Sequence, residues 1–201
     1  METKSKIIIL IFVLTGIMLF NYGCKKNEVP NNNTTTPATF SIGQSYKGGI
    51  ITYILQSGDP GYDANVNHGL ITSTIEVSSG AIWGCSGTNI SGCLNGLGTG
   101  AVNSQHILTA CTTSGIAAKV ITDVFPLNGY SDWYLPSRDE LRTLSLIRPY
   151  LPEVNFNNVF YWSSSQVFDD SAWSEYFTPG SVKDSMVSKS TLCKVIAMRS
   201  F

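Results

Sequence analysis

The chain has 201 residues, with 13 Lys and Arg against 14 Asp and Glu, and its formal net charge is −1. This balance excludes a strongly basic protein that binds nucleic acid through its charge. A hydrophobic content of 43% excludes wholesale disorder, and the length fits one domain of roughly 150 residues.

The N-terminus has the pattern of an export signal. Lys4 and Lys6 precede an uncharged, mostly apolar run over residues 7–20. This run is shorter than the ~20 apolar residues that a spanning helix needs. We therefore predict a signal peptide over residues 1–23, and an uncleaved membrane anchor is the alternative.

Cys24 follows the small residue Gly23 at the end of the apolar run. This arrangement resembles the lipobox of bacterial lipoproteins, in the looser form found in Bacteroidota, where the cysteine carries the lipid. Several acyl chains hold a protein firmly on a bilayer. We expect an outer membrane lipoprotein on the periplasmic face or the cell surface. The alternative is a secreted protein whose Cys24 stays unmodified.

Residues 24–45 are rich in Asn, Thr and Pro and show no apolar periodicity, which is typical of a flexible tether. The domain is predicted to begin between Phe40 and Tyr46 and to occupy residues 46–201.

Within that domain, β-branched and aromatic runs predict strands at its start and in its last third, at 49–55, 70–77, 160–164, 172–177 and 193–199. Helical spacing predicts helices at 104–111 and 114–124, and a glycine-rich loop is expected over 84–100. Ser137 followed by Glu140 is a capping box that predicts a third helix. Helices between two groups of strands indicate an α+β fold, and we expect the first and last strands to pair.

Four cysteines lie in the domain, and an even number in an exported chain favours disulfides. Cys85 and Cys93 are close in sequence and pair most easily, which leaves Cys111 for Cys193; Cys85 with Cys111 is the rival pairing.

No motif for a nucleophile, a metal or another cofactor is complete, so none is predicted. The Asp63–Asn67 turn has only the first part of a calcium-loop spacing, and Asx side chains in such turns commonly bond their own backbone.

Several segments of the domain form a recognisable set. They are Gly48–Ile51, Tyr53–Leu55, Gly58–Ala64, His68–Ile71, Trp83–Cys85, Gly115–Ala118, Gly129–Ser137, Asp139–Leu141, Tyr161–Ser164, Ala172–Trp173 and Val195–Arg199. Together they resemble the Lcl C-terminal domain family, named for a Legionella collagen-like adhesin, and the Fibrobacter succinogenes major paralogous domain family.

This resemblance implies a C-type-lectin-like or formylglycine-generating-enzyme-like α+β domain with two to three helices, a C-terminal antiparallel sheet and long loops. It also implies surface display and, for the adhesin, binding of sulfated glycosaminoglycans. Sulfate binding requires clustered Arg and Lys. In this sequence we expect only Lys183, Lys189 and Lys194 to gather near one hairpin.

Trp133, Tyr134, Trp162 and Trp173 either fill the core or form a platform on which a sugar stacks. If sugar binds, the candidate contacts are Asp169, Asp170, Trp173 and Glu175. Arg138, Asp139 and Glu140 are expected to cap and bridge locally, with Arg199 pairing to one of them.

The function predicted from the sequence is a lipid-anchored, non-enzymatic binding module that recognises glycans or a surface partner in an adhesion-like role. The membrane is its expected partner through the N-terminal lipid, and nucleic acid is not. The alternatives are a structural component of the cell envelope without a small ligand and an enzyme of an unrecognised kind.

Overall fold

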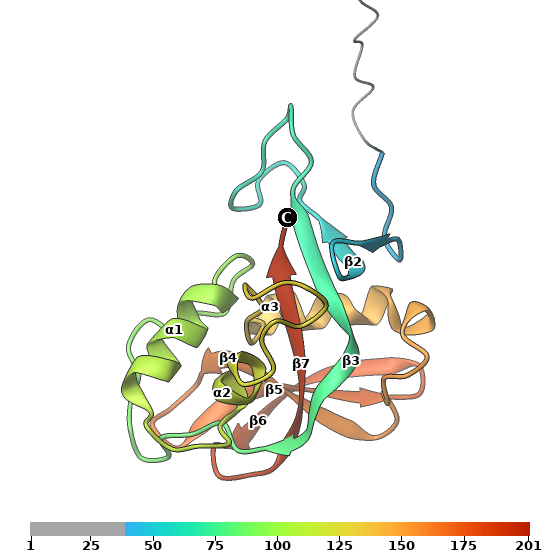
Figure 1. Ribbon diagram of the computed structural model, residues 1–201. Coiled ribbons are helices and arrows are strands. Elements are labelled where there is room, and N and C mark those ends of the chain that lie inside the picture. The colour runs from blue at the N-terminus through green and yellow to red at the C-terminus, as the bar shows by residue number, and fades with distance from the viewer. Residues whose placement is uncertain (1–38) are drawn as a thin grey trace, which may run out of the picture. The chain divides into compact units, whose positions relative to one another are not determined.

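The computed structural model describes residues 39–201, so the predicted signal peptide, Cys24 and most of the tether lie outside the described residues. The described part has seven strands and three short α-helices (Figure 1). The strands are β1 (Ser45–Tyr46), β2 (Gly49–Ile54), β3 (Gly69–Ala81), β4 (Val159–Gln166), β5 (Ser171–Thr178), β6 (Ser181–Ser188) and β7 (Cys193–Ser200). The helices are α1 (Gly100–Ala110), α2 (Ala117–Thr122) and α3 (Arg138–Arg142), and α3 runs on into the 3-10 turns η1 (Thr143–Leu146) and η2 (Arg148–Tyr150).

All seven strands form one sheet in the order β1-β2-β3-β7-β4-β5-β6. Neighbours are antiparallel except β4 and β7, which run parallel. The α+β class is thereby confirmed. The C-terminal strands do not form a separate antiparallel sheet, because β7 pairs with β3 and joins them to the N-terminal strands.

The first predicted strand and the last were expected to pair, and this expectation is wrong, because β7 pairs with β3 and not with β2. The first predicted strand, β2, forms hairpins with β1 and β3, so both of its edges are occupied. The 13-residue strand β3 keeps one free edge, and β7 pairs there. β7 therefore lies at the centre of the sheet.

Helices cover both faces of the sheet around this centre. Successive side chains of β7 point to opposite faces, so β7 contributes to two cores, one on each face. Val195 and Ala197 pack in the core under α1 and α2. Ile196 and Met198 pack in the second core under α3, η1 and η2. Both ends of the described chain join the first core, because the Phe40, Tyr46 and Phe201 rings lie 4.8 to 5.3 Å apart.

Element boundaries differ from the predictions for local reasons. The second helix is shorter than the predicted 114–124, since Gly115 has a φ of +72° and Ile116 is extended. The first helix begins four residues early, at Gly100. Strand β6 was not predicted from the sequence because its residues are mostly polar, as is typical of an edge strand and not of a buried one.

The expected Cys85–Cys93 pairing is wrong, and so is Cys111–Cys193. Cys85 and Cys111 form the disulfide, with their Cα atoms 5.6 Å apart, while Cys93 and Cys193 are buried free thiols. Gly84, at a φ of +106°, turns the chain after β3 toward the end of α1, where Cys111 lies. The Cys93 thiol points instead to the Asn103 carbonyl inside the core.

Arg199 also has a different partner from the expected one. Its guanidinium donates to both carboxylate oxygens of Asp132, at 2.7 and 2.6 Å, and lies 3.9 Å from the centre of the Tyr130 ring. This contact holds the pKa of Asp132 below its usual range. The pair ties β7 to the loop before α3, and it has a structural role.

Candidate functional site

The candidate site is built on the start of α3, where the capping box is confirmed. The Ser137 side chain accepts the Glu140 N–H, and the Glu140 carboxylate accepts the Ser137 N–H at 2.8 Å. The same carboxylate accepts the Gly98 N–H at 2.9 Å, which holds the preceding glycine-rich loop against the helix. A side chain at Gly100 would place its Cβ 2.1 Å from this carboxylate, so only glycine fits there.

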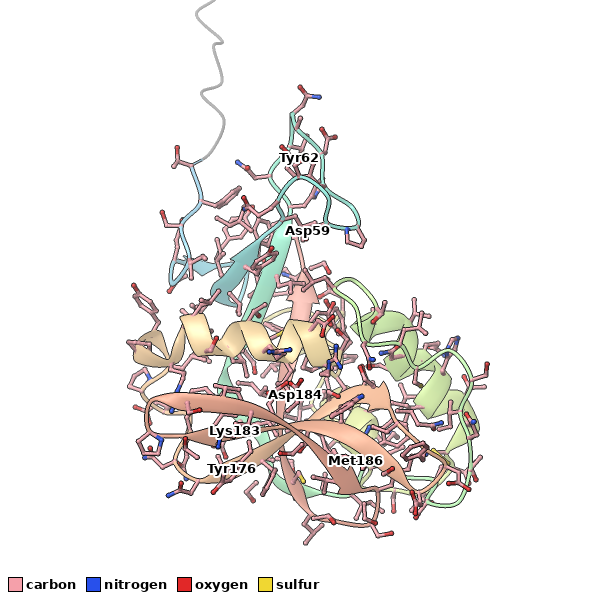
Figure 2. The ribbon with its side chains drawn as sticks, turned by 180° about the vertical axis from the view of Figure 1, so that it is seen from behind. Asp59, Tyr62, Tyr176, Lys183, Asp184 and Met186 are labelled. Atoms are coloured by element: carbon pink, nitrogen blue, oxygen red, sulfur yellow. A yellow bond between two sulfur atoms is a disulfide. The ribbon has the colours of Figure 1, made fainter. Side chains whose placement is uncertain are left out.

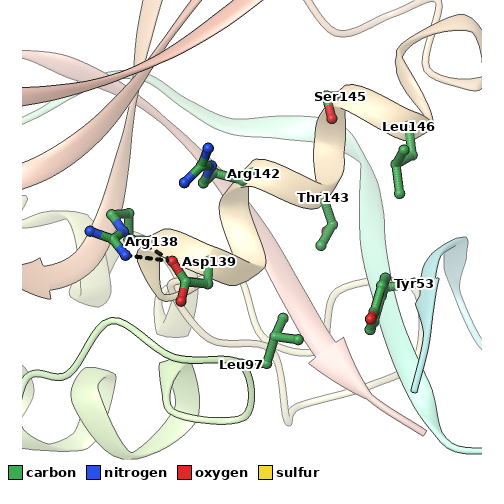
Figure 3. Close-up of a pocket in the computed structure, with 8 residues that line it drawn as sticks. All are labelled: Tyr53, Leu97, Arg138, Asp139, Arg142, Thr143, Ser145 and Leu146. Atoms are coloured by element: carbon green, nitrogen blue, oxygen red, sulfur yellow. Dashed lines mark hydrogen bonds and ion pairs between the residues drawn. The ribbon is translucent and has the colours of Figure 1, made fainter. Parts of the chain in front are cut away.

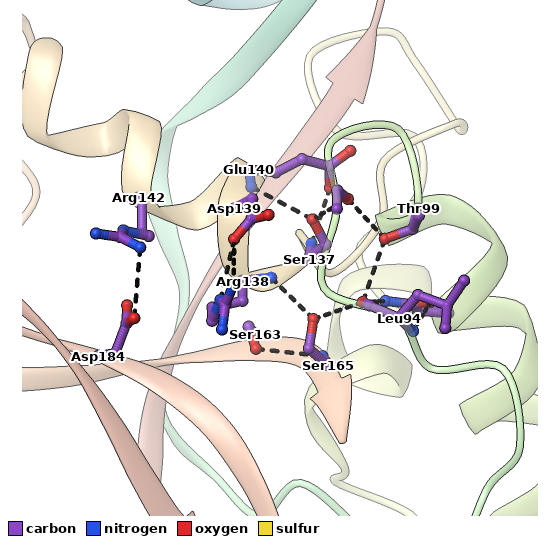
Figure 4. A network of polar contacts seen from close by, with 12 residues as sticks. Leu94, Thr99, Ser137, Arg138, Asp139, Glu140, Arg142, Ser163, Ser165 and Asp184 are labelled. Carbon is purple, nitrogen blue, oxygen red and sulfur yellow. Dashed lines mark hydrogen bonds and ion pairs between the residues drawn. The ribbon is translucent and has the colours of Figure 1, made fainter. Parts of the chain in front are cut away.

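Arg138 and Arg142 project from this anchored helix, one turn apart. The Arg138 guanidinium lies 2.9 Å from Asp139 (Figure 4). It also lies 5.3 Å from the centre of the Trp173 ring. Arg142 is more accessible, with 55% of its side chain exposed, and its nearest carboxylate is Asp184 at 3.4 Å. Arg142 therefore has guanidinium donors available for a ligand.

Both arginines line a cavity of about 460 Å³, which we call the α3 groove (Figure 3). Its lining residues come from β2, the glycine-rich loop and the α3–η1 segment, and they are Tyr53, Leu97, Arg138, Asp139, Arg142, Thr143, Ser145 and Leu146. Charged groups thus lie beside the apolar surfaces of Leu97, Leu146 and the Tyr53 ring. This combination suits a ligand with both an anionic group and an apolar face.

Two carboxyl groups lie behind the arginines, on the β5–β6 hairpin. Glu175 faces Asp184 across the strand pair and is fully buried. Burial, together with the neighbouring Asp184 carboxylate, raises the pKa of Glu175 to about 9. Glu175 is therefore protonated in the folded protein at neutral pH.

This protonation predicts a dependence of stability on pH. Unfolded Glu175 ionises above about pH 4.5, whereas the folded residue keeps its proton up to about pH 9. The unfolded state therefore binds fewer protons in this window, and the free energy of unfolding falls as pH rises through it. Burial also raises the pKa of Glu140, which adds to the slope in the same direction. We therefore expect Glu175→Gln, which stays neutral, to reduce this slope in denaturation curves recorded across the window. A slope unchanged in the variant would contradict a neutral Glu175.

The structure does not bring the four predicted sugar contacts together. Asp169 and Asp170 lie exposed at the turn between β4 and β5, where their carbonyls accept the N–H groups of Gly87 and Lys189. Trp173 is partly exposed and lies against Arg138. Glu175 is fully buried, so a ligand cannot reach it.

The aromatic residues divide between the two readings. Trp133, Tyr134 and Trp162 are buried and fill the cores, whereas Trp173 keeps an accessible surface.

Asp63, in the turn with a partial calcium-loop spacing, accepts the Asn65 N–H at 2.8 Å, so its side chain bonds the local backbone. Among residues 39–201, no three His, Cys, Asp or Glu side chains are placed to hold a metal ion.

The expected lysine cluster is not formed. Lys189 is buried, donating to the Thr88 carbonyl and to Gln166, and Lys194 is paired with Glu76. From the sequence, Arg138 was expected only to bridge locally, and Arg142 was not expected to contact a ligand. Their spacing of four residues on a capped helix was the available signal, since it places both on one helix face.

The fold and the groove define a mixed α+β domain with an arginine-lined surface site. The family model described as the Lcl C-terminal domain matches residues 74–199, more than half of the chain, and the matched range includes α3 and β4 to β7. The chain therefore belongs to the Lcl C-terminal domain family.

The crystal structure of a fimbrial protein from Bacteroides ovatus is similar in fold, with a TM-score of 0.54 and 14% sequence identity. The similarity covers 75% of this chain and 43% of that one, so the chain spans less than half of the fimbrial protein's length. No curated protein matches the chain. Within residues 39–201, no helix is long and apolar enough to cross a bilayer.

Proposed function

We propose that this chain is a lipid-anchored, exported, non-enzymatic binding module that recognises acidic glycans at the α3 groove in an adhesion-like role. Two guanidinium groups beside apolar walls in a cavity of about 460 Å³ carry this proposal. Guanidinium groups bind carboxylate or sulfate in a bidentate manner, and the Leu97, Leu146 and Tyr53 surfaces suit the C–H faces of sugar rings.

The composition of the groove favours recognition over catalysis. Hydrolysis of glycosidic bonds uses two carboxyl groups that flank the bond. Asp139 is the one carboxylate among the eight lining residues, and it is paired with Arg138. Glu175 has a raised pKa but is fully buried, so it is not available to a substrate as an acid.

Family membership and the fimbrial fold neighbour support a role at the cell surface. In this proposal, Cys24 carries the lipid, and residues 24–45 separate the domain from the outer membrane. The proposed kinship with C-type-lectin-like folds rests on the resemblance of the family to such folds, and helices that precede three antiparallel strands are compatible with it. Metabolic labelling with a fatty acid tests the anchor: label on the wild type and none on Cys24→Ser is expected, and unlabelled wild type contradicts it.

Replacing Arg142 with alanine is expected to weaken binding of an acidic glycan about tenfold, because a charge-assisted hydrogen bond is lost. Glycan arrays of acidic and neutral sugars, probed with the full chain in detergent, identify the ligand, and titration calorimetry measures the change. Lys119→Ala is the matched control, since it removes the same charge from an exposed side chain on α2.

Weakening by both variants to the same extent would indicate nonspecific charge attraction. Arrays that stay blank for the wild type, with and without calcium, would contradict glycan recognition itself.

A further inference from the structure

Strand β6 is an open edge of the sheet. It pairs with β5 along its whole length without a bulge, from Ser181↔Thr178 to Ser188↔Ser171. It pairs with no other strand of the described residues. The opposite edge, β1, has only two residues. A long, regular edge presents backbone donors and acceptors on which a further strand can pair.

The hairpin register shows which residues present these groups. The β5–β6 turn has two residues, Pro179 and Gly180, so the flanking Thr178 and Ser181 form the first hydrogen-bonded pair. Pairing then alternates along an antiparallel ladder. The backbone groups of Val182, Asp184 and Met186 are therefore directed outward, and Figure 2 shows Asp184 and Met186 along β6.

Two cavities of different character lie at the two ends of this edge. One, of about 370 Å³, is lined by Phe168, Asp170, Ser171, Met186 and Ser188. The Phe168 and Met186 side chains are 59% and 56% exposed, so this end offers an uncovered apolar surface.

The other cavity, of about 400 Å³, lies between the η1–η2 segment and the start of β6 and contains Arg142 and Arg148. Arg148 donates to the Thr178 carbonyl at 2.7 Å, and it makes no ion pair with any carboxylate of residues 39–201. This end of the edge is therefore cationic.

We propose that the β6 edge binds an extended polypeptide segment of a partner protein, which adds a strand to the sheet. Val182 lines the cationic cavity at one end of the β6 edge, and Met186 lines the apolar cavity at the other end. The two residues are four positions apart, about 13 Å along a strand. The fitting segment carries an acidic residue and a large apolar residue four positions apart, on one face. Backbone hydrogen bonds supply its affinity, and the two cavities select its side chains.

A synthetic peptide, Thr-Leu-Thr-Val-Thr-Glu-Thr, tests this inference against the full chain by titration calorimetry. We expect saturable binding with a Kd on the order of 0.1 mM. Two further peptides carry N-methyl groups on alternate residues, in the two possible phases. An added strand bonds through one set of N–H groups only, so one methylated peptide is expected to lose binding and the other to retain it.

The matched variants are Met186→Pro and Met186→Ala, both outside the α3 groove, so their result is separate from the glycan test. Both shorten the side chain, but only proline removes the outward N–H, which an edge strand tolerates. We expect the proline variant to bind at least about tenfold more weakly than the alanine variant, with the two melting at similar temperatures.

Three results of the peptide titrations would overturn the proposal. They are no binding up to about 1 mM peptide, equal binding of both methylated peptides, and equal binding by the proline and alanine variants. A dimer of the chain that Met186→Pro dissociates would also overturn it, because a second copy would then occupy the edge.

Discussion

Replacing Trp162 with alanine is expected to lower the free energy of unfolding by about 4 kcal/mol, the range for removing a large aromatic side chain from a core. Trp162 is fully buried in the core under α1 and α2. Its indole N–H donates to the Ala81 carbonyl at 2.8 Å, and this acceptor would be left buried in the variant. Denaturant unfolding followed by circular dichroism measures the change.

Trp173→Ala is the matched control on the neighbouring strand. Trp173 is partly exposed, and the Arg138 guanidinium lies 5.3 Å from the centre of its ring. We expect this variant to lose about 1 kcal/mol, mainly the cation–π contact. Equal losses for the two variants would contradict the assignment of Trp162 to the core and of Trp173 to the surface.

Removing the disulfide with Cys85→Ala and Cys111→Ala together is expected to lower the free energy of unfolding by about 3 kcal/mol. The bond closes a loop with a sequence separation of 26, and the unfolded chain gains conformational freedom when it is lost. Unfolding of the wild type and the double variant, with and without reductant, measures the difference. The double variant should not respond to reductant.

Cys93→Ala provides the control for this pairing. Cys93 is a buried thiol, so this variant keeps the disulfide and its response to reductant, apart from a packing loss of its own. In the folded wild type, a thiol reagent should label neither Cys93 nor Cys193, and in the unfolded, unreduced chain it should label both. A Cys93 variant that no longer responds to reductant would show that Cys93 is in the bond.

Features that depend on neighbouring residues were predictable from the sequence. The box formed by Ser137 and Glu140 closes within four residues, so its hydrogen bonds are encoded locally, and the helix it predicts is present. Apolar and aromatic residues make up at least half of each of the strands β2, β4, β5 and β7, which are largely buried. β6 is mostly polar because its edge position leaves it partly in solvent.

The candidate site was less predictable. Arg138 and Arg142 were visible as two residues one turn apart, but their cavity needs Tyr53 from β2 and Leu97 from the glycine-rich loop. Trp173 and Glu175 are separated by two positions, yet one borders Arg138 and the other is buried beside Asp184. Accessibility depends on what covers each strand face, and the strand's own sequence does not contain that information.

The sequence by itself determined the family, the α+β class and the capped start of α3, because these follow from local patterns and from motifs that are short and contiguous. Only the tertiary structure decided that Cys85 pairs with Cys111, that Arg199 pairs with Asp132, and that β7 lies between β3 and β4. Each of these contacts joins residues far apart in the chain. Their distances are set by how the sheet and helices pack, so spacing along the sequence could not predict them.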